Sequence, residues 1–357
     1  MNVLDLFSGC GGISSGFAQA GYQIKAGIDF DKDSIDTFSE NFKDALAICA
    51  DLNSYSENDI FNQFEQLDIQ VVVGGPPCQG FSNANRWDKE KKDPRNKLFY
   101  EYLKFVKVLK PKIVLIENVR GMLTKDNGYA KDRIINLVQE LGYNVSSNVL
   151  NAAEYGVPQN RYRAFFIAIR EDLPFDENIF ENLRTKEKVN VKDAIGELYN
   201  LEKADTDVHS ITSEPDSPYR KYLRSRKKII SNHEIVYPAE ATQTKIKFVP
   251  QGGNWRDIPK ELFDNQRNNR HSSAYKRLDE KSQSVTIDTG NAHSNYYHPK
   301  YNRIPTVREA ARIQSFQDKF IFSGSRTSQY RQIGNAVPPL LAKSIADELK
   351  VILNENY

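Results

Sequence analysis

Near its start the chain reads Val3-Leu4-Asp5-Leu6-Phe7-Ser8-Gly9-Cys10-Gly11-Gly12. The mostly apolar run Val3–Phe7 predicts a short buried strand, and the apolar spacing after Gly12 predicts a helix. Between the two, glycines allow the backbone to approach a ligand closely because they carry no side chain. Open α/β sheets bind ligands at the carboxyl ends of their strands, so this loop is a candidate binding loop.

The first half of the chain repeats this alternation of strand and helix. Short apolar runs predict further strands at 22–28, 45–49, 69–73, 112–116, 143–150 and 163–169. Helical spacing, often closed by glycine or proline, predicts helices at 13–20, 32–42, 96–110 and 129–141. The pattern indicates an α/β fold with a doubly wound, mostly parallel sheet and helices on both faces.

The pattern changes after Arg170. Residues 171–216 hold thirteen acidic and five basic residues, whereas residues 219–281 hold fifteen Lys or Arg against seven Asp or Glu. We interpret 171–320 as a smaller domain of short strands and loops, with helical spacing returning at 306–316 and 338–353. Positive charge segregated in this way indicates a surface that binds a polyanion, or else a solvated charged face.

Composition is typical of a soluble globular protein, with 39% hydrophobic and 27% charged residues. The three cysteines have a spacing that suits neither a disulfide framework nor a zinc site, so we expect reduced thiols, a cytoplasmic location and no metal. We expect no secretory segment, and the apolar runs are too short to span a bilayer.

Cys78 follows a predicted strand in the run Ile69-Gln70-Val71-Val72-Val73-Gly74-Gly75-Pro76-Pro77-Cys78. Pro76 and Pro77 restrict the backbone and supply no N–H, so the turn that carries the thiol is stiff. A lone cysteine is most often a small buried hydrophobic residue. A thiol on a rigid turn at the carboxyl end of a strand instead favours a nucleophile.

Two carboxylates follow predicted strands at the same edge. Asp29 could accept the hydroxyl groups of a ribose, and Asp51 could accept from an adenine amino group, although each is also a common helix cap. A dinucleotide loop would have a third glycine at position 14, where this chain has Ser14. With no lysine-bearing phosphate loop, the pattern favours a nucleoside without phosphates.

The chain resembles the cytosine-carbon-5 DNA methyltransferases, particularly the compact prokaryotic type found in restriction–modification systems. The resemblance runs from end to end through Asp5–Gly12, Asp29, Asp51, Gly75–Ser82, Glu117–Val119, Gln159–Arg163, Arg308–Arg312 and Gly334–Pro339. It departs from the family at Asp29, where glutamate is commoner, and at Gln317, where proline often stands.

The resemblance implies a Rossmann-like, S-adenosylmethionine-dependent catalytic domain formed by 1–170 and 321–357, with 171–320 as the target-recognition, DNA-binding domain. It implies S-adenosylmethionine as the cofactor. The cofactor contacts implied are Phe7, Gly9, Gly11, Gly12, Asp29, Asp51, Pro77 and Asn335.

The resemblance also implies covalent catalysis. A thiolate of Cys78 would add to carbon 6 of cytosine and make carbon 5 reactive, and Glu117 with a raised pKa would protonate ring nitrogen 3. Arg161 and Arg163, two residues apart on one strand face, could reach the base carbonyl or hold Glu117. A surface carboxylate and a structural arginine are the alternatives for these side chains.

Double-stranded DNA is the expected partner, and the target base must leave the helix to reach the thiol. We expect DNA contacts from Gln79, Ser82, Arg95 and Thr286, with the polar stretch 83–96 as a lid or a surface loop. Phosphate contacts would come from 219–281. We also expect a companion restriction endonuclease, and we expect the enzyme to be a monomer.

Three alternatives remain. A tRNA cytosine-5 methyltransferase would use the same chemistry, but the long basic region and Gly80-Phe81-Ser82 favour DNA. A nicotinamide oxidoreductase is disfavoured by Ser14, and a DNA-binding protein without activity is disfavoured because every chemical position is filled.

Overall fold

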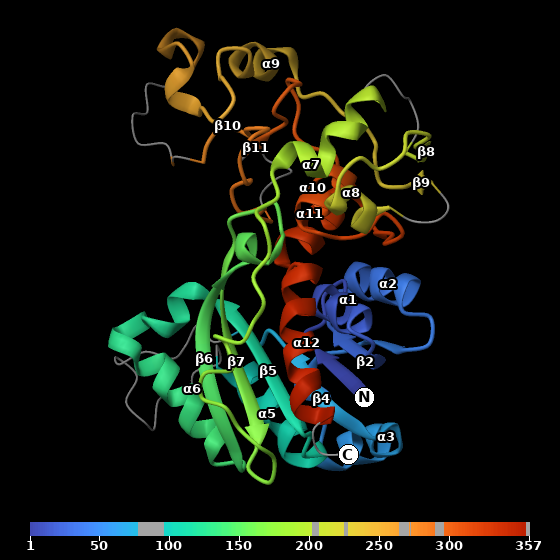
Figure 1. The fold of residues 1–357 in the computed structure, drawn as a ribbon, viewed down its shortest axis with the longest axis vertical. Helices are drawn as coiled ribbons and strands as arrows, with labels where there is room; N and C mark the ends of the chain where they lie inside the picture. The colour runs from blue at the N-terminus through green and yellow to red at the C-terminus, as the bar shows by residue number, and fades with distance from the viewer. Residues whose placement is uncertain are drawn as a thin grey trace. The chain divides into compact units, whose positions relative to one another are not determined.

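The structure is a computed structural model that describes residues 1–77, 96–201, 207–224, 228–263, 271, 273–289 and 296–354. The chain divides into two compact units (Figure 1). The first unit comprises Met1–Asn151, Tyr162–Thr185 and Pro339–Tyr357, and the second comprises Ala152–Arg161 and Lys186–Pro338. Residues 152–161 and 321–338 therefore group with the second unit and residues 171–185 with the first, whereas the resemblance implied boundaries at 170 and 320.

A seven-stranded sheet forms the centre of the first unit. Its strands are β1 (Asn2–Leu6), β2 (Gln23–Asp29), β3 (Leu46–Cys49), β4 (Ile69–Gly74), β5 (Ile113–Val119), β6 (Tyr143–Asn151) and β7 (Tyr162–Arg170). The order across the sheet is β3-β2-β1-β4-β5-β7-β6, and only β7 runs opposite to the other six strands. The predicted doubly wound, mostly parallel sheet is confirmed, and its order reverses between β1 and β4, where such sheets bind ligands.

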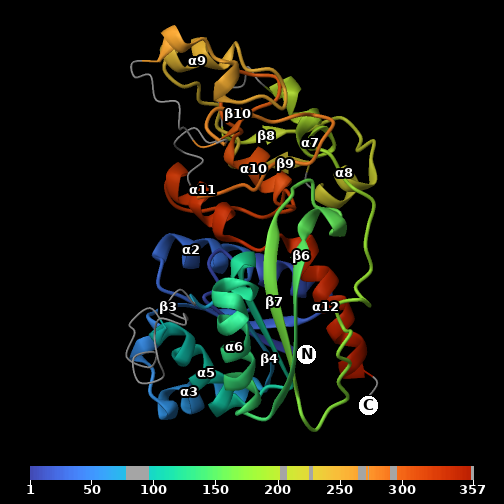
Figure 2. The same cartoon turned by 90° about the vertical axis from the view of Figure 1, so that its left-hand side faces the viewer.

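Helices cover both faces of this sheet. They are α1 (Gly12–Gln19), α2 (Lys32–Asn41), α3 (Glu57–Phe64), α5 (Lys97–Leu109), α6 (Tyr129–Gln139) and α12 (Pro339–Asn354). Figure 2 shows α5 and α6 on one side of the strands and α12 on the other. Phe64, Phe105 and Ile134 from α3, α5 and α6 join one buried cluster with alternate strand residues such as Leu4 and Val72. The central strands are buried on both faces, which explains their continuous apolar sequence.

Helix α3 is an element that the sequence analysis missed. It begins after Ser56, whose hydroxyl accepts from the Asp59 backbone N–H while the Asp59 carboxylate accepts from the Ser56 N–H. This reciprocal capping was visible in the sequence as Ser followed three residues later by Asp. The helix is only eight residues long and buries Ile60 and Phe64, so its apolar stripe is short.

The second unit contains short elements. Its helices are α7 (Val191–Ile195), α8 (Pro218–Leu223), α9 (Glu240–Ile246), α10 (Val307–Ile313) and α11 (Arg326–Asn335). Two-residue strands pair β8 (His209–Ser210) with β9 (Ile229–Ile230) and β10 (Lys276–Arg277) with β11 (Tyr296–Tyr297). The expectation of short strands and loops therefore needs correction, because several helices also belong to this region.

Buried ion pairs hold α10 in the second unit. Arg303 donates to both carboxylate oxygens of Glu309, and Arg312 does the same to Asp318. Burial alone would raise the pKa of Glu309, but Arg303 and His298 outweigh it and hold this pKa well below its usual value. Breaking such a buried pair typically costs about 3–5 kcal/mol, so the charged motif Arg308–Arg312 is a structural feature.

Among the described residues, no helix has the length and hydrophobicity needed to cross a membrane.

Candidate functional site

The loop after β1 has a backbone shape that depends on glycine. Gly9 and Gly11 have φ values of 51° and 94°, and Phe7 also adopts a left-handed conformation at 58°. A Cβ at Gly11 would lie 2.5 Å from Cε2 of Phe42, so a side chain there meets both backbone strain and a clash. The loop leads directly into α1 at Gly12.

Asp29, at the end of β2, fastens this loop. Its Oδ2 accepts from Gly9 N at 2.8 Å, and its Oδ1 accepts from Asp31 N at 2.9 Å. Burial raises the pKa of Asp29, and the two backbone N–H groups oppose that rise. Since each carboxylate oxygen can accept more than one hydrogen bond, Asp29 keeps acceptor capacity for a ligand at this edge.

Phe30 is a residue that the sequence analysis overlooked. It follows Asp29 directly, and 76% of its surface is exposed, which makes it the most exposed large hydrophobic side chain described in this structure. On the neighbouring strand Cys49 is paired with Asp29, so Asp51 follows close by and is also exposed. An exposed aromatic ring directly after Asp29 suits a flat heterocycle. The sequence did carry a signal for Phe30, because this apolar residue stands between two acidic residues, Asp29 and Asp31.

Asp51 has a local structural role. Its Oδ1 accepts from the backbone N–H and side-chain amide of Asn53 at 2.9 and 2.7 Å. This is the capping arrangement that the sequence analysis left open, and it orients the carboxylate without using all its acceptor sites.

Ser14 explains why this loop departs from the dinucleotide pattern. Its hydroxyl donates to Asp5 Oδ2 at 2.6 Å, and both side chains are buried. Burial raises the pKa of Asp5 to about 7, although the hydrogen bond from Ser14 lowers it. Position 14 therefore supplies a partner for a buried carboxyl group, which glycine cannot do.

Glu117 and Arg163 form an ion pair next to the turn that precedes Cys78. Arg163 Nε lies 2.9 Å from Glu117 Oε1, and the two side chains are 17% and 14% exposed. A Cβ at Gly75 would lie 2.9 Å from Glu117 Oε2, so the lack of a side chain there leaves room for the carboxylate. Asn118 Nδ2 donates to Pro76 O at 2.9 Å and ties the end of β5 to the same turn. Cys78, Gln79, Ser82 and Arg95 lie outside the described residues, as does most of the expected lid.

Arg161 is placed differently from Arg163. It precedes β7, so the argument from alternating strand faces does not apply to it. Its side chain is buried in the second unit, where Nη1 donates to Ile287 O at 2.9 Å and Nη2 donates to Gly334 O at 2.7 Å. This corrects the expectation that the two arginines are equivalent: Arg163 holds Glu117, and Arg161 braces two backbone segments.

The same segments are joined by further buried polar contacts. Gln159 Oε1 accepts from Ile287 N at 2.9 Å, Gln159 Nε2 donates to Gln314 Oε1, and Gln314 Nε2 donates to Ala336 O at 2.6 Å. Thr286 Oγ1 donates to Asn160 O at 2.8 Å. Asn335 is exposed at the last residue of α11. Three motifs that are distant in sequence therefore form one rigid part of the second unit.

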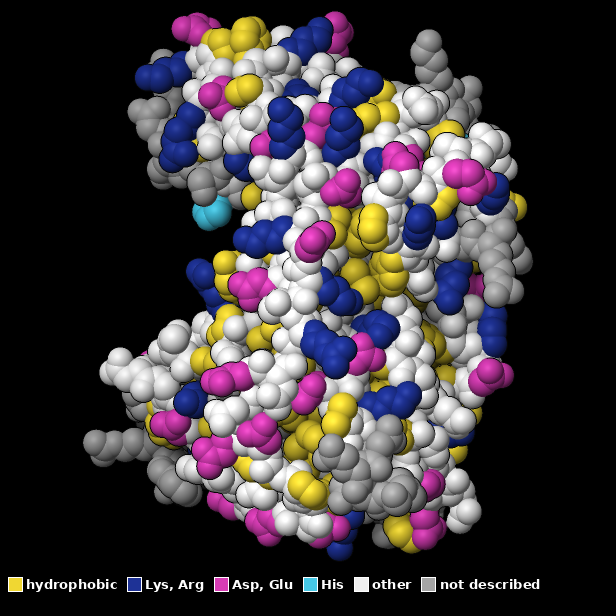
Figure 3. Space-filling view, in the orientation of Figure 1, with side chains coloured by type: hydrophobic (Ala, Val, Ile, Leu, Met, Phe, Trp, Pro, Cys, Tyr) yellow, Lys and Arg dark blue, Asp and Glu magenta, His cyan; other side chains and the backbone are white. Residues whose placement is uncertain are grey.

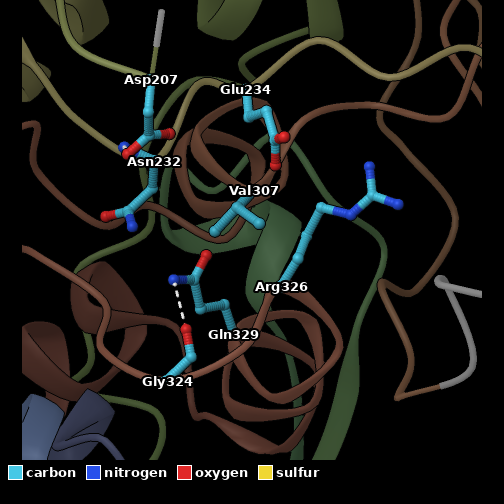
Figure 4. A pocket seen from close by; sticks show the side chains of 7 residues that line it. All are labelled: Asp207, Asn232, Glu234, Val307, Gly324, Arg326 and Gln329. Carbon is cyan, nitrogen blue, oxygen red and sulfur yellow. Dashed lines mark hydrogen bonds between the residues drawn. The ribbon is translucent and has the colours of Figure 1, made fainter.

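A separate polar pocket also lies in the second unit (Figure 4). It is lined by Asp207, Asn232, Glu234, Val307, Gly324, Arg326 and Gln329. Gln329 Nε2 donates to Gly324 O at 3.0 Å inside it. None of the predicted site residues lines this pocket.

Exposed cations of the second unit include Lys247, Arg256 and Lys260. Figure 3 shows Lys and Arg side chains over the part of this unit that carries α9 and β10. The basic stretch 219–281 thus presents charge to solvent, as a polyanion-binding surface requires.

A family model for C-5 cytosine-specific DNA methylases matches residues 1–351. The chain belongs to this family. The match confirms the resemblance inferred from the motifs and identifies the protein as an enzyme, a DNA cytosine-C5 methyltransferase. Its relatives are type II methyltransferases, which agrees with the restriction–modification type expected from the sequence.

Two relatives show how much of the chain this sequence similarity covers. Type II methyltransferase M.DdeI of Desulfomicrobium norvegicum is 35% identical over 370 residues, which cover 98% of this chain and 88% of the relative. Type II methyltransferase M1.HphI of Haemophilus parahaemolyticus is 36% identical over 359 residues, covering 99% and 88%.

Solved structures of other methyltransferases have the same fold as this methylase. A predicted DNA modification methyltransferase encoded within a prophage (E. coli) aligns with a TM-score of 0.80 at 28% identity and covers 99% of both chains. The S. pombe Dnmt2 methyltransferase aligns with a TM-score of 0.57 at 17% identity over 100% of this chain and 99% of that chain, a likeness of fold alone.

Proposed function

We propose that this enzyme transfers a methyl group from S-adenosylmethionine to carbon 5 of a cytosine extruded from a specific duplex DNA sequence. The reaction would proceed through a covalent bond between Cys78 Sγ and carbon 6 of the base. The observation that carries this proposal is the Glu117–Arg163 ion pair beside Gly75 and Pro76, on the turn that leads into Cys78.

The loop after β1 fits an adenosine-type cofactor. S-adenosylmethionine supplies an electrophilic methyl group when bound. Gly9 and Gly11 allow close approach of the backbone, Asp29 has acceptor capacity for ribose hydroxyls, and the exposed ring of Phe30 offers a surface for stacking adenine. The proposed cofactor contacts are Phe7, Gly9, Gly11, Gly12, Asp29, Phe30, Asp51, Pro77 and Asn335.

Glu117 and Arg163 would stabilise the negative charge that develops on the base, and Glu117 would interact with the proton at ring nitrogen 3. When the Cys78 thiolate adds to carbon 6, an electron pair moves toward ring nitrogen 3, and a proton at that nitrogen makes the ring a neutral enamine. We propose that the Glu117 carboxyl group hydrogen-bonds to ring nitrogen 3 and delivers a proton to it as Cys78 Sγ adds to carbon 6, while Arg163 holds the carboxyl group and can donate to the base carbonyl. After methyl transfer a base takes the proton from carbon 5, the double bond between carbons 5 and 6 re-forms, Cys78 leaves as a thiolate, and the proton on nitrogen 3 returns to Glu117. We assign Arg161 to positioning.

Thr286 is proposed to contact the nucleic-acid backbone near the target base. Its segment is braced by Asn160 and Gln159, which gives the contact a rigid support. Gln79, Ser82 and Arg95 are proposed DNA contacts on sequence grounds, and the basic surface of the second unit would bind phosphates without reading bases. We also propose that the enzyme is a monomer, that it acts in the cytoplasm, and that it has a companion restriction endonuclease.

The decisive experiment offers labelled S-adenosylmethionine with duplex DNA and, separately, with transfer RNA. We expect label in DNA as 5-methylcytosine, and sequencing of methylated DNA from cells that express the enzyme gives the target site. Label confined to RNA would instead establish the tRNA alternative.

A second measurement tests the covalent step. DNA with 5-fluorocytosine at the target position should trap a protein–DNA adduct, because the fluorine cannot leave as a proton does. The Cys78→Ser variant should form no adduct, while Cys49→Ser, which alters the exposed cysteine at the end of β3, should retain it. An adduct that survives Cys78→Ser would remove the nucleophile from the proposal.

A further inference from the structure

Arg120 and Tyr162 lie together where β5 and β7 end. The antiparallel pairing joins Glu117 with Phe165, Asn118 with Ala164 and Val119 with Arg163. Extending this register by one residue places Arg120 opposite Tyr162. The Arg120 guanidinium carbon is indeed 5.6 Å from the centre of the Tyr162 ring, a cation–π arrangement.

Both side chains face solvent. Arg120 is exposed and Tyr162 is 42% exposed, and next to them Val119 is 56% exposed. Tyr162 O also accepts from Arg163 Nη1 at 2.9 Å, which ties this pair to the Glu117–Arg163 ion pair. A cluster of cation, aromatic ring and aliphatic residue is thus held at the rim of the candidate active site, entirely within the first unit.

Among the described carboxylates, none forms an ion pair with Arg120. Some exposed cations of the first unit do pair with carboxylates, such as Lys32 with Asp36 and Lys107 with Glu57. The contact with the ring orients the guanidinium and leaves its N–H donors available, which matches the needs of a phosphate ligand.

We propose that Arg120 binds a backbone phosphate of the substrate strand next to the extruded base, and that Tyr162 holds its guanidinium ready for this contact. The inference rests on the proposed function, since it takes DNA as the substrate. Three residues along a strand span about 10 Å, so an anion bound at Arg120 lies close to the base that Glu117 would meet. Arg120 is thus a binding residue for the strand, and Tyr162 is a positioning residue.

The test measures DNA affinity between 50 and 200 mM salt for the wild type, Arg120→Ala and Arg170→Ala. Arg170 serves as the control because it lies at the opposite end of β7 from Tyr162 and its loss removes the same charge. Losing one phosphate contact lowers the slope of log affinity against log salt by about 0.9, so the advantage of the wild type over Arg120→Ala should shrink about 3.5-fold across this range. The KM for DNA should rise with little change in kcat.

Tyr162 is tested with two variants. Tyr162→Phe retains the ring and should keep wild-type affinity, whereas Tyr162→Leu should weaken DNA binding and leave the salt slope unchanged. Thermal unfolding of each variant separates lost binding from lost folding. Equal salt slopes for Arg120→Ala and the wild type, in an enzyme that methylates DNA, would overturn the inference, whereas absence of methylation in the wild type would overturn the proposed function instead.

Discussion

Glu117 and Arg163 meet because the antiparallel pairing of β5 with β7 brings two distant parts of the chain into register. Glu117→Gln keeps the shape of the side chain but removes its charge. We expect turnover to fall by about 10²-fold or more, since a group that manages a proton in the transition state contributes on that order. DNA affinity should change little.

Single-turnover methyl transfer and fluorescence anisotropy measure these two quantities. Glu57→Gln, an exposed glutamate that pairs with Lys107, serves as the control and should retain full turnover. Turnover of Glu117→Gln within threefold of the wild type would exclude the proposed role of the carboxylate.

Asp5 gives the protein a specific pH dependence. Its pKa is about 7 in the folded protein against an ordinary value of 3.8, so the native state holds a proton that the unfolded chain releases. The resulting stabilisation is fully present below pH 3.8 and is lost as the pH rises through about 7. Asp5→Asn removes this titration, so the variant should gain stability relative to the wild type between pH 5 and pH 8.

Urea denaturation at the two pH values measures this gain. Ser14→Ala should shift the loss of stability to higher pH, because it deletes a hydrogen bond that favours the ionised form of Asp5. A difference between Asp5→Asn and the wild type that does not vary with pH would contradict the assignment.

Helices α1 and α12 pack with their backbones in close contact at Gly16. A Cβ there would lie 2.5 Å from Ala342 Cβ and 2.6 Å from Lys343 N. Helix propensity alone predicts that Gly16→Ala stabilises α1 by about 1 kcal/mol. The clash involves backbone that cannot rotate away, so we expect net destabilisation of about 1–3 kcal/mol.

Chemical denaturation decides between these opposing effects. Gly121→Ala is the matched control, because nothing lies within 4 Å of its added Cβ, and its stability should change by less than about 0.5 kcal/mol. A stabilised Gly16→Ala variant would show that α12 can move away from α1.

Charge is distributed unevenly over the whole molecule, with the basic stretch in the second unit. If this surface binds phosphates, DNA affinity falls steeply with salt. Replacing Lys247, Arg256 and Lys260 together by alanine should lower the slope of log affinity against log salt by up to about 2.7. The binding constants should weaken similarly for cognate and unrelated DNA, since phosphate contacts carry no sequence information.

The control replaces Lys32, Lys43 and Lys107, which are exposed and ion-paired in the first unit. Both triple variants lose three positive charges, so an effect of net charge alone would lower both slopes equally. That outcome would contradict a phosphate-binding surface in the second unit.

The strands of the sheet were predictable because buried parallel strands are apolar on both faces and therefore read as continuous runs, as at Val71–Val73. Helix α3 was not predicted, since its short stripe carries little periodicity, although its capping pair was readable. Phe30 was overlooked because exposure cannot be read from residue type. The roles of Arg161 and Arg163 could not be separated by spacing, because the start of β7 falls between them.

The order of the motifs was enough to predict the family, and the local periodicity was enough to predict the α/β fold, since both follow directly from the sequence. The partners of individual side chains depended on long-range contacts. Ser14 donates to Asp5, and Arg163 pairs with Glu117. Arg161 donates to the carbonyl groups of Ile287 and Gly334, each more than a hundred residues away from it in the sequence. Such contacts are set by how strands and loops pack in three dimensions, and local spacing carries no information about them.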